Sequence, residues 1–174
     1  WIQFDPEVKD KLWSVWSNLH DFPRGKMTRN PKWTEYGKGG VAVSTDGGRS
    51  WKPSISGMDY DSPSTSIVLD ENSPAGKRTL YVAAYGKGVF KSVDDGKTWK
   101  LHNHGLEGSL AAFELTIQPN GTLFLITSPT PQHINGEKGR EVFMGAVYRS
   151  EDGARSWQRL DVGPKTEFPN GLAY

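Results

Sequence analysis

One eight-residue pattern occurs three times in this chain of 174 residues. It has Ser at its first position, Asp at the third, Gly or Ala at the fifth, Ser or Thr at the seventh and Trp at the eighth. The copies span residues 44–51, 92–99 and 150–157. Glycine-containing stretches that resemble each other precede the first two copies, at 36–41 and 85–90. The similarity therefore extends over a whole supersecondary unit, and the chain is a repeat protein.

Each unit is predicted to contain four short strands, because runs of apolar residues alternate with turn residues. The Asn120-Gly121 pair marks a tight hairpin in the third unit. The 20 glycines and 11 prolines of the chain disfavour helices. The expected strands are 1–5, 12–17, 41–44 and 51–55 in the first unit, 66–70, 79–84, 88–93 and 99–102 in the second, and 113–118, 122–127, 146–150 and 157–162 in the third.

Four-stranded units at this spacing are typical of β-propeller blades. We therefore predict an all-β chain, a partial β-propeller with three antiparallel blades. The blades are expected at residues 1–57, 64–104 and 111–162, with 163–174 as the start of a further blade. Closed propellers have about four to eight blades, so three do not complete a ring. The chain is predicted to be a fragment of a longer propeller, and closure by a second copy is the alternative.

At the eight-residue pattern the chain resembles the Asp-box, or BNR-repeat, family of propellers. That family includes sialidases, xyloglucan-cleaving glycosidases, sortilin-type receptor domains and photosystem assembly factors. The motif is highly specific for the fold. It does not specify the function, because catalytic and non-catalytic propellers share it.

The residues of the pattern are interpreted as structural. The aspartates are expected to accept hydrogen bonds from amides of their own turn, and the glycines to supply positive φ. Each tryptophan should begin an outer strand and pack on the neighbouring blade. The third copy has Ala154 where the family has Gly, and Gly153 beside it is expected to be the permissive residue. The structural residues are Asp46, Trp51, Asp94, Trp99, Asp152 and Trp157.

Two long insertions, 18–39 and 128–145, are predicted on one face of the propeller, together with the connections between blades. Long loops on a rigid scaffold are frequently functional. The first insertion contains candidate proton-transfer residues, His20 and Asp21, and the second is expected to be a flap. A solvated polar loop is the alternative for the first insertion. The candidate ligand-binding residues are Arg24, Lys26, Arg29, Trp33, Tyr36, Asp59, Tyr60, Asp61, His104 and His133.

Other classes of function are disfavoured by composition. The 21 basic and 20 acidic residues form no basic block, which argues against nucleic-acid binding. The absence of cysteine excludes disulfides, thiolate zinc sites and a cysteine nucleophile. No apolar run approaches the roughly 20 residues of a membrane helix. Asp59 with Asp61 gives too few ligands for calcium, and His102 with His104 lacks a third ligand, so no metal and no cofactor is predicted.

The family resemblance and the residues of the first insertion lead to a functional prediction. The chain is expected to be part of a carbohydrate-active propeller, glycoside hydrolase-like, with its ligand site on the face of both insertions. A non-catalytic propeller that binds a protein or peptide is the alternative. The Arg-Ile-Pro element of sialidases is absent, since Phe22-Pro23-Arg24 has a different order, so catalysis itself is left open. Related propellers are often secreted or periplasmic, and the same location is expected here.

Overall fold

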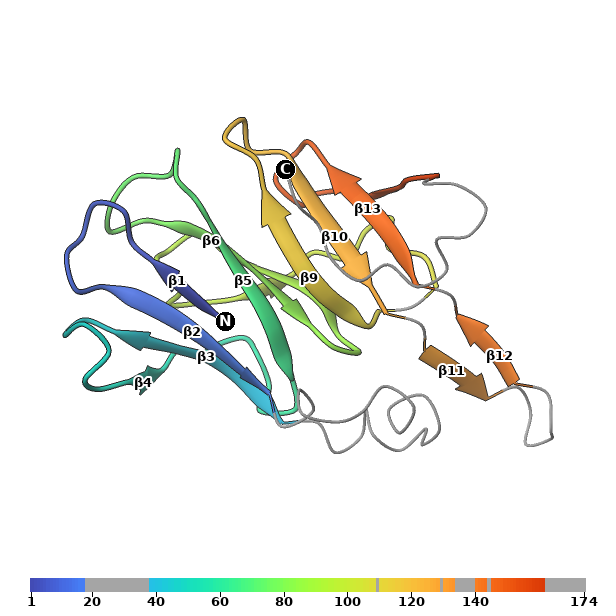
Figure 1. The fold of residues 1–174 in the computed structure, drawn as a ribbon, viewed down its shortest axis with the longest axis horizontal. Helices are drawn as coiled ribbons and strands as arrows, with labels where there is room; N and C mark the ends of the chain where they lie inside the picture. Colours follow the sequence, from blue (N-terminus) through green and yellow to red (C-terminus); the bar gives the residue numbers. More distant parts are fainter. Residues whose placement is uncertain (18–37, 109, 129, 134–139, 144, 162–174) are drawn as a thin grey trace.

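The structure is a computed structural model. It describes residues 1–17, 38–108, 110–128, 130–133, 140–143 and 145–161, and for 130–133 and 140–143 only the backbone. The described residues form three four-stranded antiparallel sheets and one two-stranded sheet, and they contain no helix (Figure 1). Each larger sheet is one blade. The predicted class, an all-β partial propeller with three four-stranded blades, is confirmed.

The strands of each blade follow one another in chain order, except for the two-stranded insertion in the third. Blade one contains β1 (Ile2–Phe4), β2 (Leu12–Ser17), β3 (Gly39–Ser44) and β4 (Lys52–Pro53). Blade two contains β5 (Ser64–Asp70), β6 (Thr79–Ala84), β7 (Gly88–Ser92) and β8 (Lys100–Leu101). Blade three contains β9 (Ala112–Ile117), β10 (Leu123–Thr127), β13 (Ala146–Ser150) and β14 (Gln158–Arg159).

The outer strands are shorter than the sequence predicted, with two residues each. In blades two and three, the tryptophan before the outer strand does not join the ladder, because its amide donates to a carbonyl of the preceding blade. In blade two, the Trp99 amide donates to the Ser56 carbonyl of blade one at 2.8 Å. The predicted outer strands of blades two and three therefore lose their first residue to a contact between blades.

The second insertion continues the antiparallel pattern of blade three. β11 (Thr130–His133) pairs with β12 (Arg140–Phe143), and His133 lies opposite Arg140. Figure 1 shows this hairpin extending beyond β10 and β13. The described part of the expected flap is thus a two-stranded sheet. Most of the first insertion, residues 18–37, lies outside the described residues.

Two apolar cores lie between the blades, because blade two packs one face of its sheet on blade one and the other on blade three. Alternate residues of β6 point to opposite sides. Leu80 and Val82 pack against blade one, whereas Tyr81 and Ala83 pack against blade three. Burial of both faces explains why β6 is almost entirely apolar. The core between blades one and two is centred on Trp13, Val41, Ile67, Leu80, Phe90 and Trp99, and the core between blades two and three on Tyr81, Val89, Leu115, Leu125, Tyr148 and Trp157.

Each box aspartate binds its own turn in the same way. In the third box, Asp152 Oδ1 accepts the Ser150 hydroxyl at 2.9 Å and the Ser156 amide at 3.0 Å, and Oδ2 accepts the Ser156 hydroxyl at 2.6 Å. The Ser156 hydroxyl and amide favour the charged form and lower the pKa of Asp152 to about 2, although burial opposes them. Asp46 and Asp94 make equivalent bonds, and their pKa values are lowered as well.

Every box turn has two consecutive residues with positive φ. They are Gly47 and Gly48 in the first box, Asp95 and Gly96 in the second, and Gly153 and Ala154 in the third. Gly153 has a positive φ of 70°, as expected of the permissive residue, but Ala154 also has a positive φ, of 65°. The alanine is completely buried, and its amide donates to the Ser150 hydroxyl at 3.0 Å. The geometry of the box is therefore imposed on Ala154 by its surroundings.

A buried ion pair joins the first two blades at the end of the box turns. Arg78 Nη2 lies 2.7 Å from Asp5 Oδ1, and both side chains are fully buried. Asp5 also accepts the amides of Glu7 and Val8, at 3.0 and 3.1 Å. Burial raises the pKa of Asp5, but the hydrogen bonds from Arg78 and from these amides outweigh it, so the pKa is lowered. Asp5 is therefore charged and fully paired in the folded state.

A first prediction concerns Gly57, whose added Cβ would lie 2.2 Å from the carbonyl oxygen of Trp99. Gly57→Ala should lower the free energy of unfolding by at least about 2 kcal/mol more than Gly121→Ala does. Gly121 is a matched control, since its φ of 84° is close to the 85° of Gly57 and nothing lies within 4 Å of its added Cβ. Denaturant unfolding measures both variants, and equal losses would contradict the close contact between blades.

A second prediction concerns the buried ion pair. Asp5→Ala leaves the Arg78 guanidinium buried without its main partner and should cost about 3 kcal/mol of unfolding free energy. Glu7→Gln, at a carboxylate 62% exposed and 3.2 Å from Arg78, should cost less than about 1 kcal/mol. Since the pKa of Asp5 is lowered from 3.8, its contribution is complete above about pH 4 and is lost as the pH falls through the folded value. Acid unfolding curves of the two variants test whether Asp5→Ala loses more unfolding free energy than Glu7→Gln.

Candidate functional site

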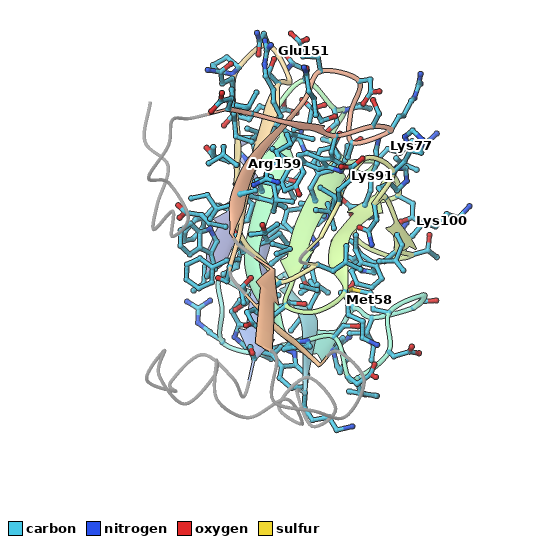
Figure 2. The ribbon with its side chains drawn as sticks, turned by 90° about the vertical axis from the view of Figure 1, so that its right-hand side faces the viewer. Met58, Lys77, Lys91, Lys100, Glu151 and Arg159 are labelled. Carbon is cyan, nitrogen blue, oxygen red and sulfur yellow. The ribbon has the colours of Figure 1, made fainter. Side chains whose placement is uncertain are left out.

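The two ends of the blades carry different loops. The box turns lie at one end. The connections between blades, the Gly86–Gly88 turn and the β11–β12 hairpin gather at the other end (Figure 1). Figure 2 shows this separation, with Glu151 of the third box and Met58 of the first connection toward opposite ends of the molecule. The end with the connections is called the connection end below.

The connection end brings Asp61 and Lys87 together. Lys87 Nζ lies 3.0 Å from Asp61 Oδ2. Tyr60, next to this pair in the chain, is 56% exposed. The Gly39 amide donates to the Tyr60 carbonyl at 3.0 Å, and Gly39 forms a parallel bridge with Asp61. The first long insertion therefore returns to the sheet directly beside Tyr60 and Asp61.

Asn103 positions the turn that carries Lys87. Its Oδ1 accepts the Val89 amide at 2.8 Å, and its Nδ2 donates to the Lys87 carbonyl at 2.7 Å. Gly88 has a φ of 91°, and a Cβ added there would lie 2.2 Å from Asn103 Oδ1. The side chain of Asn103 thus holds the backbone of Lys87, and only glycine fits between them.

Two buried polar atoms of this segment have no hydrogen-bond partner. They are Asp61 Oδ1 and Ser62 Oγ. Buried polar atoms are nearly always paired, so an unpaired one indicates a place for a water molecule, an ion or a polar group of a ligand. Asp61 therefore uses one carboxylate oxygen for Lys87 and leaves the other to accept a further hydrogen bond.

The sequence-predicted site residues are only partly brought together. Asp59, Tyr60 and Asp61 lie on one turn, closed by a 3.0 Å hydrogen bond from the Ser62 amide to the Asp59 carbonyl. His104 is exposed on the next connection, where its carbonyl accepts the Trp157 amide at 2.9 Å. The backbone of His133 lies in β11. The candidates His20, Asp21, Arg24, Lys26, Arg29, Trp33 and Tyr36 lie outside the described residues.

Sequence reasoning missed Lys87 and Asn103 as parts of the site. The Gly86-Lys87-Gly88 run forms the turn between β6 and β7, and Gly86 and Gly88 both have positive φ. The charge of Lys87 at the tip of so short a turn is the sequence feature that could have indicated a site residue. No periodic pattern marks Asn103, because its role depends on a contact between two loops.

The described residues offer little to a metal ion. They contain no group of three or more His, Asp and Glu side chains arranged to hold one. His102 is used elsewhere, since its Nδ1 lies 3.1 Å from the Ala154 carbonyl of the third box. Within the same part of the chain, no helix is long and apolar enough to cross a membrane.

A surface hollow of about 290 Å³ lies beside the third box, away from the connection end. Its charged side chains are paired with neighbours. Arg149 lies 2.5 Å from Glu151, and Asp152 accepts three hydrogen bonds from Ser150 and Ser156. This hollow therefore offers a ligand fewer uncompensated polar atoms than the segment around Asp61.

With three stacked four-stranded blades, the chain is part of a β-propeller. Solved structures agree. An ancestral GH74 enzyme matches with a TM-score of 0.60 and 21% identity, and Niastella koreensis GH74 with 0.59 and 18%. The GH74 xyloglucanase from Xanthomonas campestris matches with 0.57 and 14%. They cover 93%, 91% and 94% of this chain, which spans only 20%, 20% and 22% of theirs.

Sequence comparison gives a related result. A sialidase from Micromonospora viridifaciens is 30% identical over 102 residues, which are 51% of this chain and 16% of the sialidase. No family model matches the chain. At the level of fold, these similarities support a propeller of the sialidase and xyloglucanase type.

Proposed function

We propose that this chain is part of a carbohydrate-binding propeller of the glycoside hydrolase type, with its ligand site at the connection end. The observation that carries the proposal is the Asp61 carboxylate, which has one oxygen paired with Lys87 and the other buried without a partner. It lies where the first insertion rejoins the sheet. The similarity to GH74 enzymes and to a sialidase supports a carbohydrate as the ligand class.

The chemistry of the described residues suits a sugar. Tyr60 offers an exposed aromatic ring of the kind that stacks on sugar faces. The Asp61 carboxylate accepts hydrogen bonds from sugar hydroxyls, and Lys87 donates to ring or hydroxyl oxygens. Arg24, Lys26, Arg29, Trp33 and Tyr36 of the first insertion, with His104 and His133, extend the proposed site.

Glycoside hydrolysis is the finer part of the proposal. It needs two carboxyl groups on either side of the scissile bond, about 5–9.5 Å apart. Asp61 comes from the connection between blades one and two, and we propose Asp21 of the first insertion as its counterpart, with His20 as a proton-transfer partner. Location outside the cytoplasm, secreted or periplasmic, belongs to the same proposal and rests on the family resemblance alone.

Glycan binding by the purified chain tests the proposal. Xyloglucan oligosaccharides and sialyllactose are titrated by calorimetry against the wild type, Tyr60→Ala, Asp61→Asn and the control Glu151→Gln. Glu151 is an exposed carboxylate at the opposite end. The two site variants should raise the dissociation constant about tenfold, the effect of losing about 1.4 kcal/mol of contacts. The control should leave it unchanged.

Two results would contradict this proposal. Equal dissociation constants for all four proteins would show that Tyr60 and Asp61 are not part of the binding site. Failure of every glycan to bind would favour the alternative, a propeller that binds a protein or peptide. Where a glycan is cleaved, Asp21→Ala should abolish turnover, and Trp33→Ala should weaken binding. Turnover that survives Asp21→Ala would refute its catalytic role.

A further inference from the structure

The chain leaves the outer strand along the same path in blades one and two. The Ser54 amide donates to the Val41 carbonyl at 2.8 Å, and the His102 amide donates to the Val89 carbonyl at 2.8 Å. Val41 and Val89 both stand three residues before the first serine of a box. The two segments are therefore equivalent, and their next residues can be compared directly.

The next residue on this path is apolar in blade one and polar in blade two. It is Ile55 in blade one, and its Cγ2 would lie 2.7 Å from a Cβ added to Gly40. It is Asn103 in blade two, and its Oδ1 would lie 2.2 Å from a Cβ added to Gly88. Since blade one is built with an apolar side chain against this glycine, the blade itself does not require the amide of Asn103.

The amide of Asn103 binds the turn that carries Lys87 on both sides of Gly88. Its Oδ1 accepts the Val89 amide at 2.8 Å, and its Nδ2 donates to the Lys87 carbonyl at 2.7 Å. Asn103 is half-buried, so water competes less for these two hydrogen bonds than it would at an exposed position. Ile55 offers no such bonds to the corresponding segment of blade one.

Blade three holds Asn103 in place. The Trp157 indole Nε1 donates to the His102 carbonyl at 2.8 Å, and the Trp157 amide donates to the His104 carbonyl at 2.9 Å. Asn103 stands between these two carbonyls in the chain, and Trp157 is only 4% exposed. One buried tryptophan thus fixes the backbone on both sides of Asn103, which is the kind of rigid support that keeps a binding group in position.

Lys87 is the residue whose position this arrangement determines. Its Nζ lies 3.0 Å from Asp61 Oδ2, and its side chain is 32% exposed. A lysine side chain is flexible, and a partly exposed ion pair is weak unless its geometry is held. A fixed Lys87 backbone keeps the ammonium beside Asp61 Oδ2 and leaves the unpaired Oδ1 to a ligand.

We propose that Asn103 is a positioning residue for the Lys87–Asp61 pair and, through this pair, for the ligand. Trp157 fixes Asn103, Asn103 fixes the turn, and the turn directs Lys87 Nζ to Asp61. The effect on glycan binding rests on the proposed function, whereas the ordering of Lys87 does not. The site then depends on blade three as well as on the first connection.

The order of the Lys87 side chain tests the proposal without a ligand. The whole chain is labelled with ¹³C and ¹⁵N lysine, and the Lys87 signals are assigned by comparison with Lys87→Met. The two Hε protons of an ordered Lys87 should have distinct NMR shifts in the wild type, and these should merge in Asn103→Leu. Asn72→Leu is the matched control and should leave them unchanged, because Asn72 Nδ2 also holds a neighbouring loop, at the Pro119 carbonyl, but at the box end.

A double-mutant cycle tests the effect on binding. Xyloglucan oligosaccharides and sialyllactose are titrated by calorimetry against the wild type, Asn103→Leu, Lys87→Met and the double variant. Each single change should raise the dissociation constant about five- to tenfold. The double variant should bind no more than about twofold more weakly than Lys87→Met, because Asn103 acts through Lys87. Circular dichroism verifies folding, and Asn103→Asp, which lacks the donor to the Lys87 carbonyl, replaces Asn103→Leu if that variant does not fold.

The outcomes separate this proposal from the proposed function. Lys87 signals that are already merged in the wild type, or that Asn103→Leu leaves distinct, overturn the positioning role. So does a double variant whose loss of affinity equals the product of the two single losses, since Asn103 would then act independently of Lys87. If no glycan binds the wild type but Asn103→Leu merges the Lys87 signals, the proposed function fails and the positioning role stands.

Discussion

The docking of a box tryptophan on the preceding blade is the contact on which the stacking of the blades depends. One residue provides both hydrogen bonds and apolar packing between the blades. The Trp99 ring is 2% exposed in the core between blades one and two, while its amide and indole nitrogens are bonded to carbonyls of blade one. Because both nitrogens bind main-chain atoms, the contact sets the distance and register of the blades with little dependence on neighbouring side chains.

The box turn prepares the tryptophan for this contact. Two consecutive residues with positive φ reverse the chain, and the aspartate fixes the turn from within through three hydrogen bonds in each copy. The third box shows how strong this constraint is, since Ala154 adopts the same conformation as Gly96. A left-handed alanine is unfavourable by about 1–2 kcal/mol, which the hydrogen bonds of the turn and the burial of its methyl group offset.

How far the sequence predicts the structure depends on whether a feature repeats. The three blades, most strand positions and the Asn120-Gly121 hairpin follow from patterns that recur or are local. The length of the outer strand in blade two does not follow from such a pattern. It depends on the Trp99 amide, which binds a carbonyl of blade one instead of joining its own sheet. The Asp61–Lys87 pair joins two loops 26 residues apart, and no local pattern encodes such a distance. The Asp5–Arg78 pair was missed for the same reason, as its partners are 73 residues apart.

The division between the two ends of the blades explains why the motif identifies a fold and leaves the chemistry open. At the box end, the carboxylate oxygens of the aspartates accept hydrogen bonds from their own turns, so these groups stay charged and their hydrogen bonding is satisfied. These aspartates are Asp46, Asp94 and Asp152. Such groups are poor proton donors or nucleophiles at neutral pH. At the connection end, the loops differ from blade to blade, and Asp61 keeps an acceptor without a partner. Because the loops of the connection end differ from blade to blade, specific chemistry can vary there while the repeated box keeps the fold unchanged.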